Sequence, residues 1–271
     1  MTTQMTKPLS TAVAPRWLRA TPAAVPLVLA LLLIATAIAY PLTSGGARDA
    51  VSWTIVGLGS ALSLVHAGIS RGRRTALGLL LLVGGTAVAF EAVGLATGFP
   101  YGEYRYSDAL GPTLLGVPFL VPLAWLMMAW PSFLLAEHLA RRRPVRIAVA
   151  AAVFAAWDVV LDPQMVQAGY WTWTHPQPGL PGIDTVPLTN LAGWLLAGAV
   201  LMTALDLLVA RTQAAGSPRI GPAAPLLALA WMTLGGALAH AGWLGLPGSA
   251  AWGVALAVPV LGALALQRWR R

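Results

Sequence analysis

Eight long apolar segments constrain what this chain can fold into more than any other feature. Each contains about 20 predominantly apolar residues, the length that an α-helix needs to cross a hydrocarbon core of roughly 30 Å. The predicted segments are residues 24–42, 50–70, 75–97, 113–138, 146–163, 187–210, 222–243 and 249–267. We therefore expect an all-α fold, a polytopic transmembrane helical bundle of about eight spans. Residues 21–271 are expected to form this single transmembrane domain, after a flexible basic tail at residues 1–20.

The composition is that of a membrane protein. Soluble domains usually have about 25% charged residues, whereas this chain has 10% and is 58% hydrophobic. These values exclude a soluble globular domain and a disordered chain, and the absence of cysteine excludes disulfides, thiolate catalysis and cysteine-ligated metals. A net charge of +8 would indicate nucleic acid as the partner of a soluble chain. Here we expect the basic side chains to meet membrane lipids, and no nucleic acid.

The basic residues predict the orientation of the bundle in the cell membrane. Fifteen of the 17 Lys and Arg residues fall in the N-terminal tail, in every second connection or at the C-terminal end. Only Arg48 and Arg105 fall on the other side. Because basic residues accumulate on the cytoplasmic side of multi-pass proteins, both termini are predicted to be cytoplasmic. The alternation independently supports an even number of spans.

The nine carboxylates divide into two groups. Six are predicted in loops or near helix ends, where ion pairing at the surface explains them. These are Asp49, Glu103, Asp108, Glu137, Asp184 and Asp206. The other three, Glu91, Asp158 and Asp162, fall inside predicted membrane segments. Since a charged side chain at the bilayer centre costs about 2.5–3.5 kcal/mol, we interpret these three as a functional site or a structural polar network, and we favour a functional site.

Spacing and orientation place the three membrane carboxylates in the outer half of the bilayer. Asp158 and Asp162 are four residues apart, so they share one helix face at roughly 6 Å. Two carboxylates this close in a low dielectric do not both ionise readily, so one of them is expected to hold a proton. Glu91 lies about two turns before the outer end of its own segment. The sequence alone leaves open whether Glu91 faces the aspartates.

Two long polar loops emerge on the same side as these carboxylates. One follows Glu91 and the other follows Asp162, and both are rich in aromatic residues. Trp and Tyr also form interfacial belts that anchor membrane helices, but three Tyr, one Arg and several Gly within ten residues favour a ligand site. The candidate substrate-binding residues are Tyr101, Tyr104, Tyr106, Trp171, Trp173, Asn190 and Trp194.

The four histidines do not form a recognisable metal motif. His66, His138, His175 and His240 have no metal-ligand spacing on a helix. We expect His66 and His240, which fall in membrane segments, to be buried and satisfied by a neighbouring group. Phosphate-binding, dinucleotide-binding and nucleophile-elbow motifs are also absent from the sequence, and no internal repeat supports an inverted-repeat transporter.

Several motifs between about residues 85 and 200 occur in an order typical of one family. They are FEAVGLATGFPYGEYRY (90–106), LGP (110–112), VPFLVPLAW (117–125), WDVVLDPQM (157–165), WTW (171–173) and VPLTNLAGW (186–194). In these segments the chain resembles the integral membrane carotenoid biosynthesis proteins, and among them the carotenoid 1,2-hydratases of the bisanhydrobacterioruberin hydratase type.

This resemblance implies an enzyme of the hydro-lyase class. The reaction is the acid-catalysed addition of water across the terminal C1–C2 double bond of an acyclic carotenoid end group, which gives a tertiary alcohol. The implied partners are a carotenoid drawn from the bilayer and water, and the resemblance leaves room for contact with other carotenoid enzymes. No cofactor and no metal are expected.

The residues allow roles to be assigned for this chemistry. One of Asp158 and Asp162 is expected to be the general acid, and Glu91 or the other aspartate to position and deprotonate water. The aromatic candidates are expected to line the end-group pocket, where their faces stabilise a tertiary cation. Asn190 is expected to hold water or the new hydroxyl group.

Three other interpretations remain open at the level of sequence. A carotenoid cyclase or isomerase begins with the same protonation and then loses a proton. A non-catalytic lipid or solute carrier would use the same carboxylates as a relay. A purely structural aromatic belt predicts that substitution of the carboxylates impairs folding rather than product formation.

Overall fold

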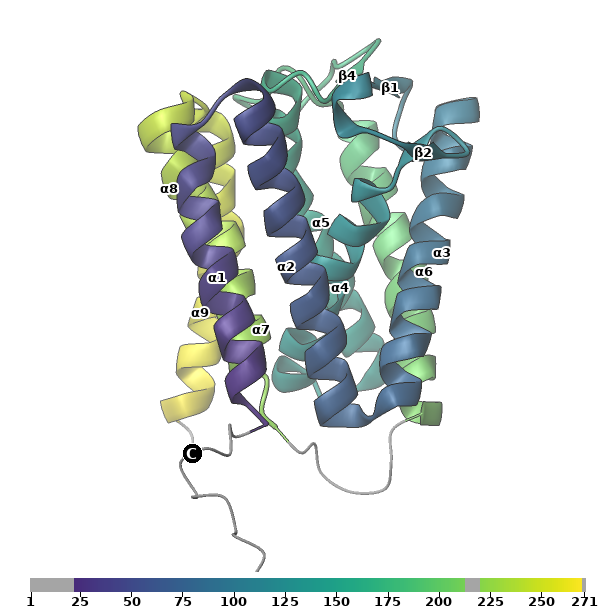
Figure 1. The fold of residues 1–271 in the computed structure, drawn as a ribbon, viewed down its shortest axis with the longest axis vertical. Coiled ribbons are helices and arrows are strands. Elements are labelled where there is room, and N and C mark those ends of the chain that lie inside the picture. The colour runs from purple at the N-terminus through teal and green to yellow at the C-terminus, as the bar shows by residue number, and fades with distance from the viewer. Residues whose placement is uncertain (1–21, 213–219, 270–271) are drawn as a thin grey trace, which may run out of the picture.

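The computed structural model describes residues 22–212 and 220–269, so the predicted tail at residues 1–20 lies outside the described part. The described residues confirm an all-α polytopic bundle, in which long helices run side by side along one axis (Figure 1). Seven helical stretches within these residues are long and apolar enough to cross a membrane. An eighth helix, α9, has an apolar part at Pro247–Val260.

The helices follow the predicted segments closely. Their bounds are α1 Ala24–Ala39, α2 Gly45–Arg71, α3 Arg73–Thr97, α4 Leu120–Leu139, α5 Arg143–Gln167, α6 Leu188–Thr212, α7 Ala223–Ala230, α8 Gly236–Ala239 and α9 Pro247–Trp269, with short 3₁₀ turns η2 at Tyr40–Leu42 and η3 at Asp108–Leu110. Gly72 alone separates α2 from α3, and its φ of 107° is a value that favours glycine. The first helix begins and the last ends at the same end of the bundle (Figure 1).

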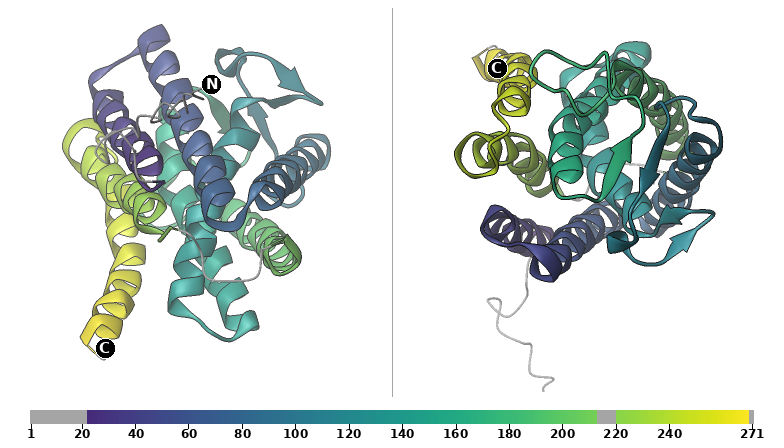
Figure 2. Two further views of the ribbon diagram at one scale, coloured as in Figure 1. Left: turned by 60° about the horizontal axis from the view of Figure 1, so that its bottom comes forward. Right: turned by 90° about the horizontal axis from the view of Figure 1, so that it is seen from above.

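Helix α4 forms the centre of the bundle, where it packs against α2, α3, α5 and α7 (Figure 2). Its large side chains Trp125, Trp130 and Phe133 are fully buried. Close approach to α2 depends on Gly59, because a Cβ atom there would lie 2.2 Å from the Cγ atom of Met127. The outer helices α1 and α3 instead keep most of their leucines exposed, as a lipid-facing surface requires.

The prediction of one helix over residues 113–138 is wrong for its first seven residues. These residues form a small hairpin of β2 (Thr113–Leu114) and β3 (Val117–Pro118), and α4 begins only at Leu120. The hairpin turn contains Leu115 and Gly116, which both have positive φ. Positive φ is incompatible with a continuous right-handed helix. The apolar character of these residues misled the prediction, since periodicity does not separate short strands from helix.

The predicted segment at residues 222–243 forms one stretch of membrane-spanning length, Ala223–Leu244, but this stretch is not uniformly α-helical. After α7 the chain widens into a π-helical turn, η4 (Trp231–Gly235), returns to α8, and widens again in η5 (His240–Leu244). The paired glycines Gly235 and Gly236 lie at the junction of η4 and α8. Such π-helical turns are rare and occur frequently at functional sites.

The two long outer loops are joined in a ribbon that the sequence did not predict. Strand β1 (Tyr104–Tyr106) pairs antiparallel with β4 (Trp171–Trp173), so that Tyr104 faces Trp173 and Tyr106 faces Trp171. Figure 1 shows this ribbon over the end of the bundle opposite to the start of α1. The pairing therefore brings together the two segments that follow Glu91 and Asp162.

Candidate active site

The three predicted membrane carboxylates are all buried in the half of the bundle beneath the ribbon. The exposed fractions are 4% for Glu91, 1% for Asp158 and 3% for Asp162. Asn190, near the start of α6, joins the two aspartates through one amide nitrogen. Its Nδ2 atom lies 2.8 Å from Asp158 Oδ2 and 2.5 Å from Asp162 Oδ2. The predicted i,i+4 pair thus has both carboxyl groups turned toward one neutral donor.

Glu91 accepts hydrogen bonds from two phenols of β1. The hydroxyl groups of Tyr104 and Tyr106 lie 2.5 and 2.7 Å from Glu91 Oε2. Side chains at i and i+2 of a strand point to the same face, so both tyrosines reach into the bundle. Arg105, between them, is exposed on the other face of the ribbon. The alternation of the strand therefore delivers two donors to one carboxylate oxygen.

Strand β4 donates a hydrogen bond to Asp162 in the same way. Trp171 Nε1 donates to Asp162 Oδ1 over 3.1 Å, and Trp173 Nε1 donates to the carbonyl oxygen of Tyr101 over 3.0 Å. Across the ribbon, the rings of Tyr106 and Trp171 have centroids 5.7 Å apart. The side chain that binds Glu91 therefore contacts the side chain that binds Asp162, which places the two carboxyl groups on one continuous aromatic surface.

The phenols at this site stay protonated. Burial, together with the nearby carboxyl of Glu91, raises the pKa values of Tyr101, Tyr104 and Tyr106 above the usual value of 10. Tyr104 and Tyr106 therefore remain neutral donors to Glu91 throughout the neutral range. The hydroxyl of Tyr101 is buried and has no hydrogen-bond partner among the described residues, so it is available to a ligand.

Further aromatic side chains form the inner wall of the site. Trp194 of α6 lies at the centre of this wall, with ring centroids 4.9 Å from Trp125, 5.2 Å from Phe154 and 6.3 Å from Trp157. The candidate site residues chosen from the sequence did not include Trp125 and Trp157, although both lie within the family motifs at residues 117–125 and 157–165. Trp157 directly precedes Asp158, which was a signal that could have identified it.

A cavity of about 270 Å³ connects these groups. Nine of the ten predicted site residues line it, including Glu91, Asp162 and Asn190. Asp158 does not: it borders a separate cavity of about 20 Å³ beneath Ile183 and Pro187. The two aspartates therefore occupy different positions, Asp162 facing the large cavity and Asp158 behind it.

The large cavity also extends to the lipid-facing side of the bundle. Ile38 of α1, Leu238 of α8 and Trp243 of η5 line it, and each of the three has an exposed fraction of at least 50%. The helical stretch of α7, η4, α8 and η5, which we call the interrupted helix, thus contributes to this apolar end of the cavity. One cavity consequently joins a lipid-facing opening to buried carboxyl groups.

Comparison with known proteins identifies the family. The model of the family described as "Carotenoid biosynthesis protein" matches residues 51–260, from α2 into α9. This chain belongs to the carotenoid biosynthesis protein family. It is similar to the bisanhydrobacterioruberin hydratase of Haloarcula japonica, with 38% identity over 139 residues. That match covers 49% of this chain and 45% of the relative, so the chain spans less than half the length of the relative. No solved structure matches the chain.

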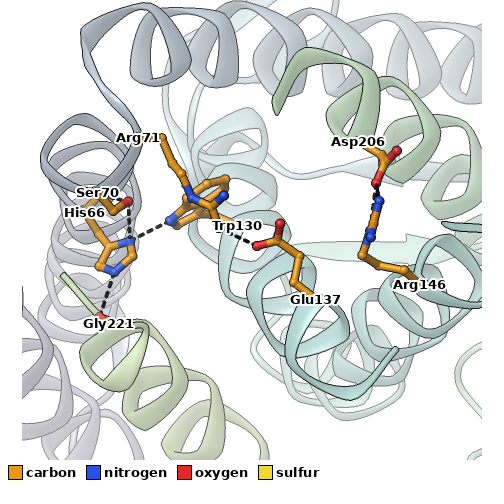
Figure 3. Close-up of polar contacts among 8 residues, drawn as sticks. All are labelled: His66, Ser70, Arg71, Trp130, Glu137, Arg146, Asp206 and Gly221. Atoms are coloured by element: carbon orange, nitrogen blue, oxygen red, sulfur yellow. Dashed lines mark hydrogen bonds and ion pairs between the residues drawn. The ribbon is translucent and has the colours of Figure 1, made fainter. Parts of the chain in front are cut away.

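Two further carboxylates of this carotenoid biosynthesis protein pair with arginines. Asp206 pairs with Arg143 at 2.6 Å. Figure 3 shows the pairs of Asp206 with Arg146 and of Glu137 with Arg71, the latter at 2.6 Å. The prediction of ion pairing is confirmed for both carboxylates, but Asp206 is buried rather than at the surface. The N-terminal turn of α5 explains this difference, because its two arginines cover the carboxylate of α6.

Both membrane histidines of the family member are buried and satisfied, as expected. His66 Nδ1 accepts a hydrogen bond from Trp130 Nε1 over 3.0 Å, and Nε2 lies 3.1 Å from the carbonyl oxygen of Gly221 (Figure 3). His240 lies 2.8 Å from the Ser249 hydroxyl and 2.9 Å from Gln164 Oε1. Among the described residues, no group of three His, Cys, Asp or Glu side chains is arranged to hold a metal ion.

Proposed function

We propose that this protein is a carotenoid 1,2-hydratase of the cell membrane. It would add water across the terminal C1–C2 double bond of an acyclic carotenoid end group and release a tertiary alcohol. The name of the relative, a hydratase, supports this reaction class. The observation that carries the proposal is the cavity that joins exposed apolar residues at one end to buried Glu91 and Asp162 at the other.

The dimensions of the cavity favour a bound end group rather than a whole carotenoid. Sites for small molecules usually have volumes of about 300–1,000 Å³, and this cavity, at about 270 Å³, lies just below that range. We propose that the end group lies beneath the ribbon while the polyene extends past Ile38 and Leu238 into lipid. The substrate then enters laterally and does not cross the aqueous phase.

Asp162 is the proposed general acid. It lines the substrate cavity, whereas Asp158 does not. Asn190 holds both carboxyl groups close together, and two neighbouring carboxyl groups in a low dielectric retain a proton between them. Asp162 would transfer this proton to C2, which forms a C–H bond and leaves a tertiary cation at C1. Asp158 then acts as a positioning residue through Asn190.

The aromatic wall would stabilise the cation. Trp125, Trp157, Trp194 and Tyr101 line the cavity, and cation–π contact with such rings is worth about 0.5–2 kcal/mol each, with the larger values in water-poor sites. The absence of Lys and Arg from the residues lining this cavity favours the cation further. This environment stabilises the charge that develops in the transition state more than the neutral substrate.

Glu91 is the proposed base for water. As water forms a C–O bond to C1, its extra proton would pass to Glu91, whose carboxylate is oriented by Tyr104 and Tyr106. Asp162 loses one proton and Glu91 gains one. Once a proton returns from Glu91 to Asp162, the cycle has consumed one water molecule and no net proton. Acid, base and water are sufficient for these steps.

Product analysis tests the proposal against its competitors. The protein is expressed in a host that makes acyclic carotenoids, and the pigments are analysed by mass. A hydratase adds the mass of one water, a cyclase or isomerase leaves the mass unchanged, and a carrier leaves the pigment itself unchanged. Asp162→Asn and Glu91→Gln are each expected to lower the yield of hydrated product by about a hundredfold or more, whereas the exposed loop variant Asp108→Asn serves as the matched control. Full hydration by both site variants would contradict the assignment.

A further inference from the structure

The cavity is also lined by polar side chains other than the proposed acid and base. Tyr40 of η2, Ser52 of α2 and Gln164 of α5 are among them. Tyr40 is 5% exposed, and its buried hydroxyl has no hydrogen-bond partner among the described residues. Because a buried polar group without a partner costs about 1–3 kcal/mol, this hydroxyl calls for a ligand that can hydrogen-bond to it.

His240 orients the side chain of Gln164, so that its amide group can hydrogen-bond to the same ligand. Its Oε1 atom lies 2.9 Å from His240 Nε2, and His240 Nδ1 lies 2.8 Å from the Ser249 hydroxyl. When His240 donates to Oε1, the Gln164 amide group keeps its own two N–H donors. Gln164 and Tyr40 line the same cavity. A tyrosine hydroxyl and an amide therefore provide donors and an acceptor in one cavity.

Polar groups connect Tyr40 with the outer surface. The Arg48 guanidinium carbon lies 5.2 Å from the centroid of the Tyr40 ring, and the Ser52 hydroxyl donates to the Arg48 carbonyl oxygen over 2.9 Å. Asp49 accepts a hydrogen bond from the Tyr170 hydroxyl over 2.6 Å. Arg48 and Asp49 are both partly exposed at the outer end of α2. A polar strip thus leads from the surface to the cavity.

The direct route to the carboxyl groups is covered by the ribbon. Tyr101 and Tyr104 are buried beneath it, and the rings of Tyr104 and Trp173 have centroids 5.9 Å apart. Tyr106 and Trp171 form the adjoining ring pair. A water molecule in a protein interior needs two to four polar partners, and these ring faces provide none. Water for the reaction therefore requires a different entrance.

We propose that water enters the reaction site along the strip of Arg48, Asp49, Ser52 and Tyr40, and that the hydroxyl of Tyr40 and the amide of Gln164 bind it inside the cavity. The ligand is water itself, and the inference rests on the proposed hydration. Tyr40 acts as a positioning residue that holds the water molecule before it passes to Glu91 and attacks C1. The same cavity then takes carotenoid from its lipid-facing opening and water from this polar strip.

The role of Tyr40 can be separated from protonation by deuterium labelling. In D₂O, Asp162 delivers deuterium to C2 and leaves the cation at C1. If water forms the C–O bond, the product is a labelled tertiary alcohol. If no water attacks, Glu91, the base that would otherwise take the proton of water, removes the original hydrogen from C2 and returns the alkene with the deuterium from Asp162 at C2. The ratio of alcohol to deuterated alkene therefore measures capture by water, independently of the amount of folded protein.

The experiment compares three variants in liposomes that contain an acyclic carotenoid. Tyr40→Phe is expected to lower the capture ratio by about threefold to tenfold, the factor expected for one neutral hydrogen bond, and Ser52→Ala by about twofold. Thr54→Val is the matched control. Thr54 lies on the same helix and makes the same kind of hydrogen bond to the carbonyl four residues earlier, but it does not line the cavity. Its ratio should equal that of the wild type.

Each outcome gives a distinct answer. A wild-type capture ratio in both Tyr40→Phe and Ser52→Ala overturns the water path, even if total turnover falls, because a merely structural role changes the amount of active protein and not the ratio. In that case the proposed hydratase function stands. If the wild-type protein returns only deuterated alkene, or leaves the carotenoid unlabelled, the proposed function itself is overturned and the water path with it.

Discussion

Asp162 and Asp206 are equally buried, at 3% exposure, yet they lie in opposite halves of the bundle with different partners. Asp206 pairs with Arg143 and Arg146. Within residues 22–212 and 220–269, Asp162 accepts hydrogen bonds from the amide of Asn190 and the indole of Trp171 and pairs with no arginine or lysine. Cationic partners favour an ionised carboxylate, whereas two neutral donors beside a second carboxyl group allow it to keep a proton.

The contrast explains why burial alone did not distinguish function from structure. Both aspartates have an explanation for being buried, but only Asp162 faces a cavity. A carboxylate held by two arginines stabilises the packing of α5 on α6. A carboxyl group held by neutral donors at a cavity wall can exchange a proton with a ligand. Substitution of Asp162 is therefore expected to lower activity, and substitution of Asp206 to lower stability.

Asp162→Asn should have the largest effect on activity. Because it removes the proposed proton donor, hydration should fall by about a hundredfold or more. Asparagine keeps the shape of the side chain, so the unfolding midpoint in detergent should change little. Pigment mass analysis and a thermal melt on the same preparation measure the two effects. Retained activity would place the acid elsewhere and remove the contrast with Asp206.

Asp206→Asn should show the opposite result. It leaves Arg143 and Arg146 without their carboxylate, and breaking a buried ion pair typically costs about 3–5 kcal/mol. We expect about 2 kcal/mol, since the side chains of Arg143 and Arg146 are partly exposed. The melting temperature should fall while the folded fraction keeps its activity per molecule. A specific loss of turnover without loss of stability would contradict a structural role.

Tyr106→Phe should reduce activity more modestly. The variant removes one of two phenol donors to Glu91, so the hydration rate should fall about threefold to tenfold. In a Glu91→Gln background the same substitution should have almost no further effect, because the two side chains act through one contact. Equal losses in both backgrounds would show that Tyr106 acts independently of Glu91.

The smallest effect concerns alkaline stability. Burial and the hydrogen bond to Asp49 raise the pKa of Tyr170 to about 12. The unfolded phenol ionises near pH 10, so the contribution of Tyr170 to stability is complete below pH 10 and is lost as the pH rises toward about 12. Melting temperatures measured across this interval should fall less steeply for Tyr170→Phe than for the wild type. Parallel curves would contradict this linkage.

The sequence predicted the helices and selected nine residues that line one cavity because the signals for both are local. Runs of apolar residues define spans, and the i,i+4 spacing of Asp158 and Asp162 fixes a shared helix face. Isolated carboxyl groups in apolar segments point to a site. These properties are visible without knowledge of which helices are neighbours.

The remaining features depend on contacts between distant parts of the chain. Nothing in the local pattern indicates that residues 104–106 pair with residues 171–173, or that Asp158 lies behind Asp162. Tyr40 follows the apolar helix α1, which has both exposed and buried side chains, and only the packing of η2 beside η5 reveals that it lines the cavity. Gln164 and His240 meet through packing of α5 with the interrupted helix.

The strand register of β1 and β4 has a consequence for how the two outer loops can vary. Side chains alternate between the two faces of a strand, so a shift by one residue exchanges the inner and outer sets. A single insertion before Tyr104 that slipped the pairing would turn Arg105 toward Glu91 and leave both phenols in water. Chimeras that exchange one loop with a relative therefore require the matching loop as well, and the pair should be inherited as one unit.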